Sequence, residues 1–157
     1  MQFVKSCPTF TLIPIKNDME KSVPLKILIV DDDPDDLEYL KFIFDRNKDF
    51  EITACLEDGS AAVRHITESG NVPDVLLVDM YMPMMTGSEV VTKLSETAAA
   101  KNMNAFIIST TINRTEEENH RHNPNVKFLE KPTTLAHMND LPGVILSHLN
   151  LPNANVI

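Results

Sequence analysis

Short apolar runs alternate with amphipathic segments along the chain from residue 25 to about residue 149. Three of the five runs are nearly all aliphatic, which is typical of parallel strands that helices cover on both faces. The runs that we predict to be strands are residues 25–30, 51–56, 75–78, 105–108 and 126–129. Helices are therefore expected in the segments that follow them.

The segments after the first three runs have the spacing of helices with one apolar face. The residues that give this spacing are Leu37, Leu40 and Phe44, then Ala62 and Ile66, then Val90, Val91 and Leu94. We expect Gly59 to open the second helix and Ser88 to be the N-cap of the third. Pro142 and Gly143 should interrupt the last helix, leaving a kink or two short pieces.

A fourth helix, short and very polar, is predicted to end near residue 123, because Thr115 and Glu118 have the spacing of a capping box. His120 and His122 lie two residues apart and so do not share a helix face. This arrangement disfavours a metal site at the fourth helix and predicts a solvated surface there.

Five strands, each followed by a helix, predict right-handed βαβ units and a doubly wound α/β fold. Folds of this kind bind ligands in the crevice beyond the carboxyl ends of the strands. The residues at those ends are Asp31, Asp32 and Asp33 after the first run, Asp79 after the third, Ser109 and Thr110 after the fourth, and Lys131 after the fifth. These residues are the first candidates for function.

The chain has 157 residues, 43% of them hydrophobic, which fits one domain with an ordinary core. Its formal net charge of −9 disfavours sequence-independent binding to nucleic acid and suits a metal ion or a basic partner. Cys7 and Cys55 give neither a disulfide framework nor a zinc spacing, as in a reduced, cytoplasmic protein. No apolar stretch approaches the ~18 residues that span a bilayer, so we expect neither secretion nor membrane insertion.

We expect residues 1–24 to be a loose N-terminal extension, residues 25–150 to be the folded domain and residues 151–157 to be a tail. The first of these segments contains three prolines and has no helical or strand periodicity. Met19 precedes the first strand by six residues, which suggests the hypothesis that the native protein begins there. Mass spectrometry of the native amino end would test whether residues 1–18 are genuine.

The sequence ILIVDDDPDD, residues 27–36, places an aliphatic strand directly before five aspartates. The proline suits the first position of a helix, which makes Asp33 the N-cap and places the last two aspartates where the helix dipole favours negative charge. Asp31 and Asp32 have no such explanation, and carboxylates at close range repel each other unless a cation compensates them. Together with Asp79 they predict an oxygen-ligand site for a hard cation such as Mg²⁺.

An aspartate at the end of a buried strand can serve merely as the cap of the next helix. For Asp79 this alternative is weaker, because Pro83 and Gly87 shape a loop and Ser88 is a better cap. Asp79 is thus available for chemistry. Lys131, held before a rigid proline at the end of the fifth strand, is predicted to reach the carboxylates as a point charge.

The spacing of these residues resembles the receiver domain of bacterial response regulators over about residues 25–149. The matching set is the acidic pair after the first strand, Asp79 with Pro83 at +4 and Gly87 at +8, Ser109 thirty residues beyond Asp79, Phe128, and Lys131-Pro132 twenty-two residues beyond Ser109. Within two-component signalling the chain is most similar to the single-domain kind. The resemblance implies a flavodoxin-like (βα)5 fold with a five-stranded parallel sheet in the order 2-1-3-4-5.

The resemblance also implies that Asp79 accepts a phosphoryl group from a phosphohistidine of a sensor histidine kinase or a phosphotransfer protein. Mg²⁺ would be bound beside Asp79 by Asp32 and by the backbone carbonyl of Tyr81, with Asp31 assisting through water. The metal-binding set is therefore Asp31, Asp32, Asp79 and Tyr81.

The remaining roles fall to residues on the fourth and fifth strands. Lys131 and Ser109 would act with Asp79 in catalysis, Lys131 by contacting the phosphoryl oxygens. Ser109 and Phe128 match the family's switch pair, which reshapes the partner-binding surface after phosphorylation.

On this interpretation the protein is a signalling phosphoacceptor that catalyses only its own phosphorylation and dephosphorylation. Its signal would pass to an unidentified protein partner, to a second copy in a homodimer, or onward with the phosphate, without direct binding to nucleic acid or membrane. Two alternatives stay open, a receiver-like interaction module that needs no phosphorylation and a Mg²⁺-dependent phosphatase. The second is disfavoured because such enzymes carry another aspartate where this chain has Tyr81. Thr110 and Tyr81, both near the predicted acyl phosphate, favour a comparatively long-lived phosphoryl state.

Overall fold

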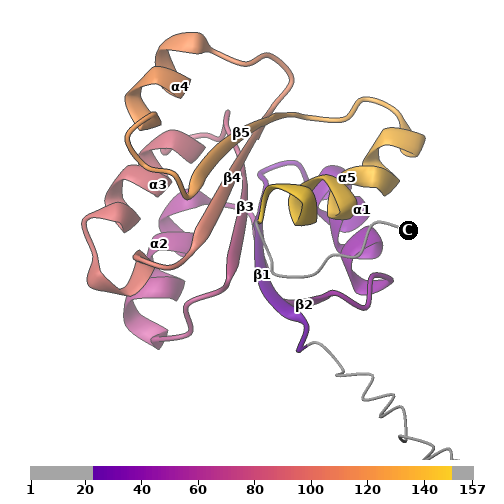
Figure 1. Ribbon diagram of the computed structural model, residues 1–157, viewed down its shortest axis with the longest axis horizontal. Helices are drawn as coiled ribbons and strands as arrows, with labels where there is room; N and C mark the ends of the chain where they lie inside the picture. Colours follow the sequence, from indigo (N-terminus) through magenta and orange to yellow (C-terminus); the bar gives the residue numbers. More distant parts are fainter. Residues whose placement is uncertain (1–22, 150–157) are drawn as a thin grey trace, which may run out of the picture.

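The computed structural model describes residues 23–149, which form a five-stranded parallel sheet with helices on both faces (Figure 1). The strands are β1 (Leu25–Val30), β2 (Phe50–Leu56), β3 (Val75–Asp79), β4 (Asn104–Ser109) and β5 (Val126–Glu130). They lie in the order β2-β1-β3-β4-β5, and every pairing is parallel. The predicted fold class and strand order are confirmed.

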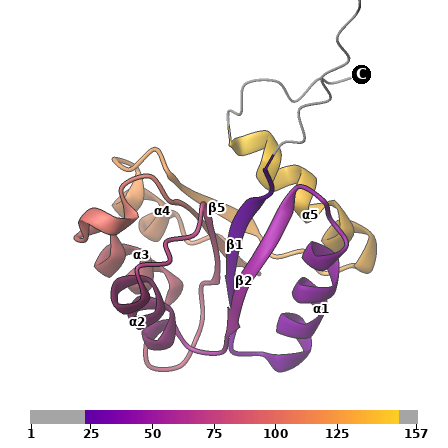
Figure 2. The same cartoon turned by 90° about the horizontal axis from the view of Figure 1, so that it is seen from below.

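Helices follow each strand and divide between the two faces of the sheet. They are α1 (Pro34–Asp45), α2 (Gly59–Ser69), α3 (Gly87–Ser95), α4 (Arg114–His120) and α5 (Leu135–His148), with a short 3-10 helix η1 (Ala98–Ala100) after α3. Figures 1 and 2 show α1 and α5 on one face and α2, α3 and α4 on the other. Within residues 23–149, no helix is long and apolar enough to cross a bilayer. The predicted extension and tail, and the hypothesis about Met19, fall almost wholly outside the described residues, and the domain limits of 25–150 stay a prediction.

The alternation of side chains along β1 explains how one sheet supports two cores. Ile27 and Ile29 pack with α1 and α5, whereas Leu28 and Val30 pack with α2 and α3. All four side chains are fully buried. A strand with helices on both faces needs apolar residues at every position, which is the pattern that the sequence has.

The start of α1 is as predicted. The carboxylate of Asp33 accepts hydrogen bonds from the backbone N–H groups of Asp35 and Asp36, and Pro34 is the first helical residue. Gly59 opens α2 as predicted, after Asp58 as its N-cap. Two of the five helix starts thus follow from local sequence.

The predicted start of α3 is wrong by two residues. Thr86, not Ser88, is the N-cap, and it forms a reciprocal capping box with Glu89, whose side chain accepts a hydrogen bond from the Thr86 backbone N–H. This box satisfies two helix-terminal donors at once, so it is the better cap. Ser88 lies inside the first turn and is buried.

The ends of α4 and the course of α5 also differ from the prediction. Asn113 caps α4 by accepting a hydrogen bond from Thr115 N–H, so Thr115 and Glu118 form no capping box, and the helix ends at His120. α5 runs unbroken through Pro142 and Gly143. Leu141 and Ile145 pack in the core with the sheet, Pro142 is buried beside them, and the packing of the helix outweighs the cost of an interior proline.

The surface of α4 is only partly as predicted. His122 is exposed, in agreement with a solvated surface, but His120 is half-buried and makes a hydrogen bond to α3. No side chain of α4 is fully buried. Its attachment to the domain is therefore unlike that of the other helices, each of which buries several residues.

Candidate functional site

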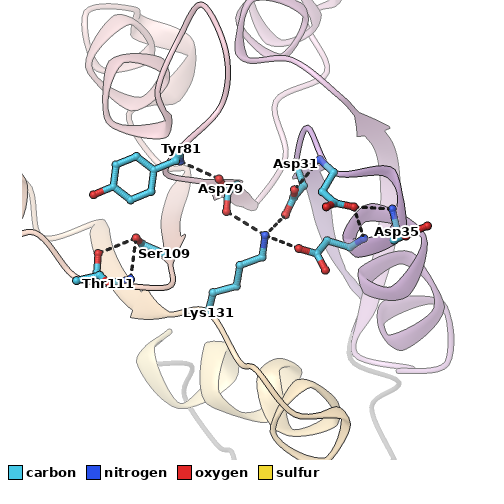
Figure 3. Close-up of polar contacts among 9 residues, drawn as sticks. Asp31, Asp35, Asp79, Tyr81, Ser109, Thr111 and Lys131 are labelled. Carbon is cyan, nitrogen blue, oxygen red and sulfur yellow. Dashed lines mark hydrogen bonds and ion pairs between the residues drawn. The ribbon is translucent and has the colours of Figure 1, made fainter.

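An ion-pair cluster lies at the carboxyl ends of β1, β3 and β5 (Figure 3). Asp31 follows β1, Asp79 is the last residue of β3, and Lys131 follows β5. The Lys131 ammonium nitrogen lies 2.8 Å from a carboxylate oxygen of Asp31 and 3.1 Å from one of Asp79. Three of the predicted site residues are thus brought together by strands that are distant in sequence.

The backbone of Lys131 is also held in place, by β4. Its N–H donates a 2.7 Å hydrogen bond to the carbonyl of Ser109, which continues the pairing of β4 with β5 beyond the ends of the strands. The side chain then lies across the end of the sheet toward β3 and β1, as Figure 3 shows. The prediction that Lys131 faces the carboxylates is borne out by this geometry.

Asp36 also binds Lys131, at 2.7 Å, which the sequence analysis did not anticipate. Its place in the first turn of α1, where the helix dipole favours negative charge, is by itself a sufficient reason for an aspartate there. A signal was nevertheless present, because helical side chains lean toward the helix N-terminus and so toward the end of the preceding strand. Three carboxylates therefore share one ammonium.

The electrostatics of the cluster follow from its burial. Asp31 is fully buried, and desolvation raises the pKa of its carboxyl despite the opposing hydrogen bond from Lys131. Burial alone would lower the pKa of Lys131, but its hydrogen bonds to Asp31 and Asp36 outweigh that effect and raise it. Lys131 is thus charged at neutral pH and compensates part of the negative charge at the strand ends.

Asp79 is 7% exposed, and both of its carboxylate oxygens are engaged. One accepts a hydrogen bond from Lys131, and the other accepts one from the backbone N–H of Tyr81 at 2.8 Å. The Tyr81 side chain, in contrast, is 55% exposed. Asp79 is therefore held in position at the carboxyl end of β3, with a small part of its side chain open to solvent.

Gly87 determines how the loop after Asp79 returns to the sheet. A Cβ atom at Gly87 would lie 2.4 Å from the carbonyl oxygen of Asp79, so no other residue fits without displacing backbone. The Gly87 N–H donates a 3.0 Å hydrogen bond to the carbonyl of Met80. Within the loop, Met84 has a φ of 68° and a fully exposed side chain.

Ser109 and Phe128, the predicted switch pair, do not interact with Asp79 in this structure. The Ser109 hydroxyl donates a 2.7 Å hydrogen bond to the carbonyl of Thr111 (Figure 3). Phe128 is half-buried, and its ring centroid lies 5.9 Å from that of His120. Ser109 is nevertheless buried at the end of β4, the strand that pairs with β3.

The predicted metal ligands are only partly assembled. Asp31 and Asp79 share the Lys131 ammonium, whereas Asp32 is exposed and takes no part in these ion pairs. Among residues 23–149, no group of three or more His, Cys, Asp or Glu side chains is arranged to hold a metal ion. The available donors are carboxylate and carbonyl oxygens, which are the ligands that Mg²⁺ prefers, so the chemistry of the set fits that ion. Metal binding stays a prediction.

The sequence of the chain matches the response regulator receiver domain family over residues 27–141. The chain belongs to this family. As a receiver domain it has the fold and the strand-end residues that the sequence resemblance implied. The family match lies inside the predicted domain of residues 25–150.

Individual relatives support the same assignment. The receiver is 39% identical over 88 residues to the transcriptional regulatory protein YdfI of Bacillus subtilis, covering 56% of this chain and 38% of YdfI. The chain therefore spans well under half the length of that curated relative.

Solved receiver domains have the same architecture. The phosphorylated cyanobacterial phytochrome response regulator RcpA superposes with a TM-score of 0.68 at 22% identity, over 83% of this chain and all of the other. CheY, in a CheX–CheY–BeF3⁻–Mg²⁺ complex from Borrelia burgdorferi, gives a TM-score of 0.65 at 25% identity, over 82% of this chain and 92% of the other. At such identities the RcpA comparison supports the fold alone.

Proposed function

We propose that this receiver accepts a phosphoryl group on Asp79 from a phosphohistidine of a sensor histidine kinase or phosphotransfer protein, with Mg²⁺. The observation that carries the proposal is the shared ammonium of Lys131, which lies within 3.1 Å of both Asp79 and Asp31. A cation in that place compensates the charge of an anion that arrives at Asp79. Family membership supports the same role.

The chemistry requires little beyond positioning and charge compensation. An oxygen of Asp79 attacks phosphorus, the P–N bond of the phosphohistidine breaks, and the histidine recovers its electron pair. Negative charge on the equatorial oxygens is compensated by Lys131. The hydrogen bond from Tyr81 N–H orients the Asp79 carboxylate before the reaction.

The residues that would hold Mg²⁺ are Asp31, Asp32, Asp79 and the carbonyl of Tyr81. The ion supplies positive charge that reduces repulsion between the incoming phosphoryl group and these carboxylates. The related CheX–CheY complex from Borrelia burgdorferi contains Mg²⁺ together with BeF3⁻. The ion would bind to the same carboxylates, Asp31 and Asp79, that Lys131 now compensates.

Phosphorylation would act on Ser109 and Phe128. The Ser109 hydroxyl now donates its hydrogen bond to the carbonyl of Thr111. A phosphoryl group on Asp79 would offer this hydroxyl a stronger, charged acceptor. Movement of Ser109 leaves space into which Phe128 turns, and the surface of β4, β5 and α4 changes with it. A protein partner or a second copy would recognise the changed surface.

Incubation with acetyl phosphate and Mg²⁺, followed by intact-mass measurement, tests the proposal. We expect one added phosphoryl group on the unaltered protein and on Asp45→Asn, which changes an exposed aspartate at the end of α1. Asp79→Asn should gain none, and EDTA should prevent the gain on every variant. An unaltered protein that gains no phosphoryl group from either acetyl phosphate or a phosphorylated kinase domain would favour the alternative, an interaction module that needs no phosphorylation.

A further inference from the structure

α4 is held to the domain by polar contacts rather than by a buried apolar face. None of its side chains is fully buried, whereas α3 buries Val90, Val91 and Leu94 among others. Figure 1 shows α4 alongside α3 and beside β5. The contacts that fix this short helix are therefore few and identifiable.

Ser88 is the centre of these contacts. It is 6% exposed, and its hydroxyl donates a 2.7 Å hydrogen bond to the carboxylate of Glu116. The same oxygen lies 2.8 Å from Nε2 of His120. A serine hydroxyl has one hydrogen, so the second bond requires that Nε2 of His120 carries the proton and donates it. Glu116 and His120 are four residues apart and thus face α3 together.

His120 joins this polar cluster to Phe128. Its ring lies 5.9 Å from the Phe128 ring, at an interplanar angle of 44°. Burial lowers the pKa of His120, although the nearby Glu116 carboxylate opposes the effect, so the neutral ring is the favoured form. A neutral imidazole that donates from Nε2 can hydrogen-bond Ser88 and pack against an aromatic ring at the same time.

The other end of the cluster reaches the loop of Asp79. Ser88 directly follows Gly87, whose backbone is packed against the Asp79 carbonyl and hydrogen-bonded to Met80. A displacement of the end of β3 or of its loop therefore moves Ser88 with it. Asp79 and Ser88 are connected through backbone contacts alone, so no side-chain rotation can absorb a displacement between them.

We propose that Ser88, Glu116 and His120 form a latch of positioning residues that holds α4 and Phe128 in the arrangement found here and connects them to the Asp79 loop. The latch is a second connection between the phosphoacceptor and α4, separate from Ser109. Its role in signalling rests on the proposed function, but its role in holding α4 does not. The bond to Glu116 is charge-assisted, which makes it stronger than one between neutral groups.

Amide hydrogen exchange of the unphosphorylated full chain tests the latch directly. We expect Ser88→Ala and His120→Gln to accelerate amide exchange in residues 114–120 by roughly fivefold or more. This factor corresponds to the loss of one ordinary hydrogen bond, about 1 kcal/mol, from the free energy of opening α4. The matched controls are His122→Gln and Glu117→Gln, because both residues are exposed on the same segment. Exchange in β1 and β3 should stay unchanged, which distinguishes release of α4 from a loss of global stability.

The tautomer of His120 reports the hydrogen bond to Ser88 directly, whereas amide exchange reports only the stability of the helix. Two-bond ¹H–¹⁵N correlation spectra should show His120 as the Nε2–H form in the unaltered protein. Ser88→Ala should return the ring toward a mixture of tautomers, while His122 in the same spectra stays constant. If exchange in α4 and the His120 tautomer are the same in Ser88→Ala as in the controls, the latch does not exist.

A third measurement separates the latch from the proposed function. Phosphorylation of the unaltered protein should change exchange in α4, and the change should be reduced in Ser88→Ala and His120→Gln. If these variants respond as fully as the unaltered protein, the connection to Asp79 is refuted. If the unaltered protein accepts no phosphoryl group, the proposed function fails, and the first two measurements still decide whether the latch holds α4.

Discussion

Lys131 compensates three carboxylates with one ammonium group, and this ratio determines the energetics of the site. A buried carboxylate is costly unless it is paired, and Asp31 is fully buried. Its partner is shared with Asp36 and Asp79, so each carboxylate receives only part of the compensation. The site thus retains excess negative charge for a further cation.

Replacement of Asp31 with asparagine should stabilise the protein in the absence of Mg²⁺. The folded-state pKa of Asp31 is raised above 3.8, so its contribution to stability is fully present below that value and is lost as pH rises through the folded pKa. At pH 7 the cost of burying the ionised group exceeds its stabilisation by Lys131, and asparagine removes both. The carbonyl oxygen of asparagine can still accept from Asp33 N–H, and Lys131 keeps its ion pairs with Asp36 and Asp79. We expect the free energy of unfolding to rise by ~0.5–2 kcal/mol.

Urea unfolding at pH 7, with EDTA present, measures this change. The control is Asp35→Asn, which alters an exposed aspartate in the first turn of α1. This variant should lose about 0.3 kcal/mol or more of helix-dipole stabilisation. Phosphorylation from acetyl phosphate should fall for Asp31→Asn and not for Asp35→Asn. A lower stability of Asp31→Asn at pH 7 would contradict the electrostatic account.

For single residues, the sequence predicts which side chains come together but not which of them share a partner such as Lys131. Asp31, Asp79 and Lys131 were predicted because strand ends converge in a parallel sheet. The ion pair of Asp36 and the burial of His120 were not, because both depend on the direction of a helical side chain toward a neighbouring element. Spacing within one segment contains no information about that neighbour.

Among the elements, the apolar runs located the five strands and the apolar spacing located α1, α2 and α3, whereas the caps were harder to predict. Thr86 and Ser88 are both suitable cap residues by type, and the close packing of Gly87 on Asp79 fixes the helix start between them. Asn113 and Thr115 present the same ambiguity at α4. At α3, tertiary packing thus decides between two locally acceptable starts.

Two glycines test the conformational account of the helices in opposite directions. Gly143 lies inside α5, and a Cβ there would meet no atom within 4 Å, so Gly143→Ala should raise the free energy of unfolding by about 0.5–1 kcal/mol. Gly70 ends α2 with a φ of 69°, so Gly70→Ala should lower it by ~1 kcal/mol. Denaturant midpoints of the two variants measure both effects. Changes of the same sign would show that backbone conformation does not control these positions.

For the whole molecule, the order of the strands determines where the candidate site lies. β1 and β3 are adjacent in the centre of the sheet, so Asp31 and Asp79 meet although 48 residues separate them. The carboxyl ends of parallel strands all lie at one end of the sheet, which is why the site was predictable from sequence. The net charge of −9 adds a general attraction for cations.

Mg²⁺ should raise the melting temperature of the whole domain if the strand-end carboxylates bind it. At a concentration ten times its dissociation constant, a ligand stabilises the folded state by about 1.4 kcal/mol, which shifts the melting temperature by a few degrees, roughly 3–6 °C. We expect this shift for the unaltered protein and Asp35→Asn, and little for Asp32→Asn. Sodium chloride of equal ionic strength is the control, and an equal shift with it would attribute the effect to screening alone.

The weak burial of α4 has a consequence for how this receiver can diversify. Because no side chain of the helix belongs to a core, its exposed positions can accept new residues with little penalty to folding. Under the proposed function, recognition of a different partner can therefore evolve on α4 while the sheet, the ion-pair cluster and Ser88 stay as they are. Relatives that differ mainly in this helix would share one chemistry and address separate targets.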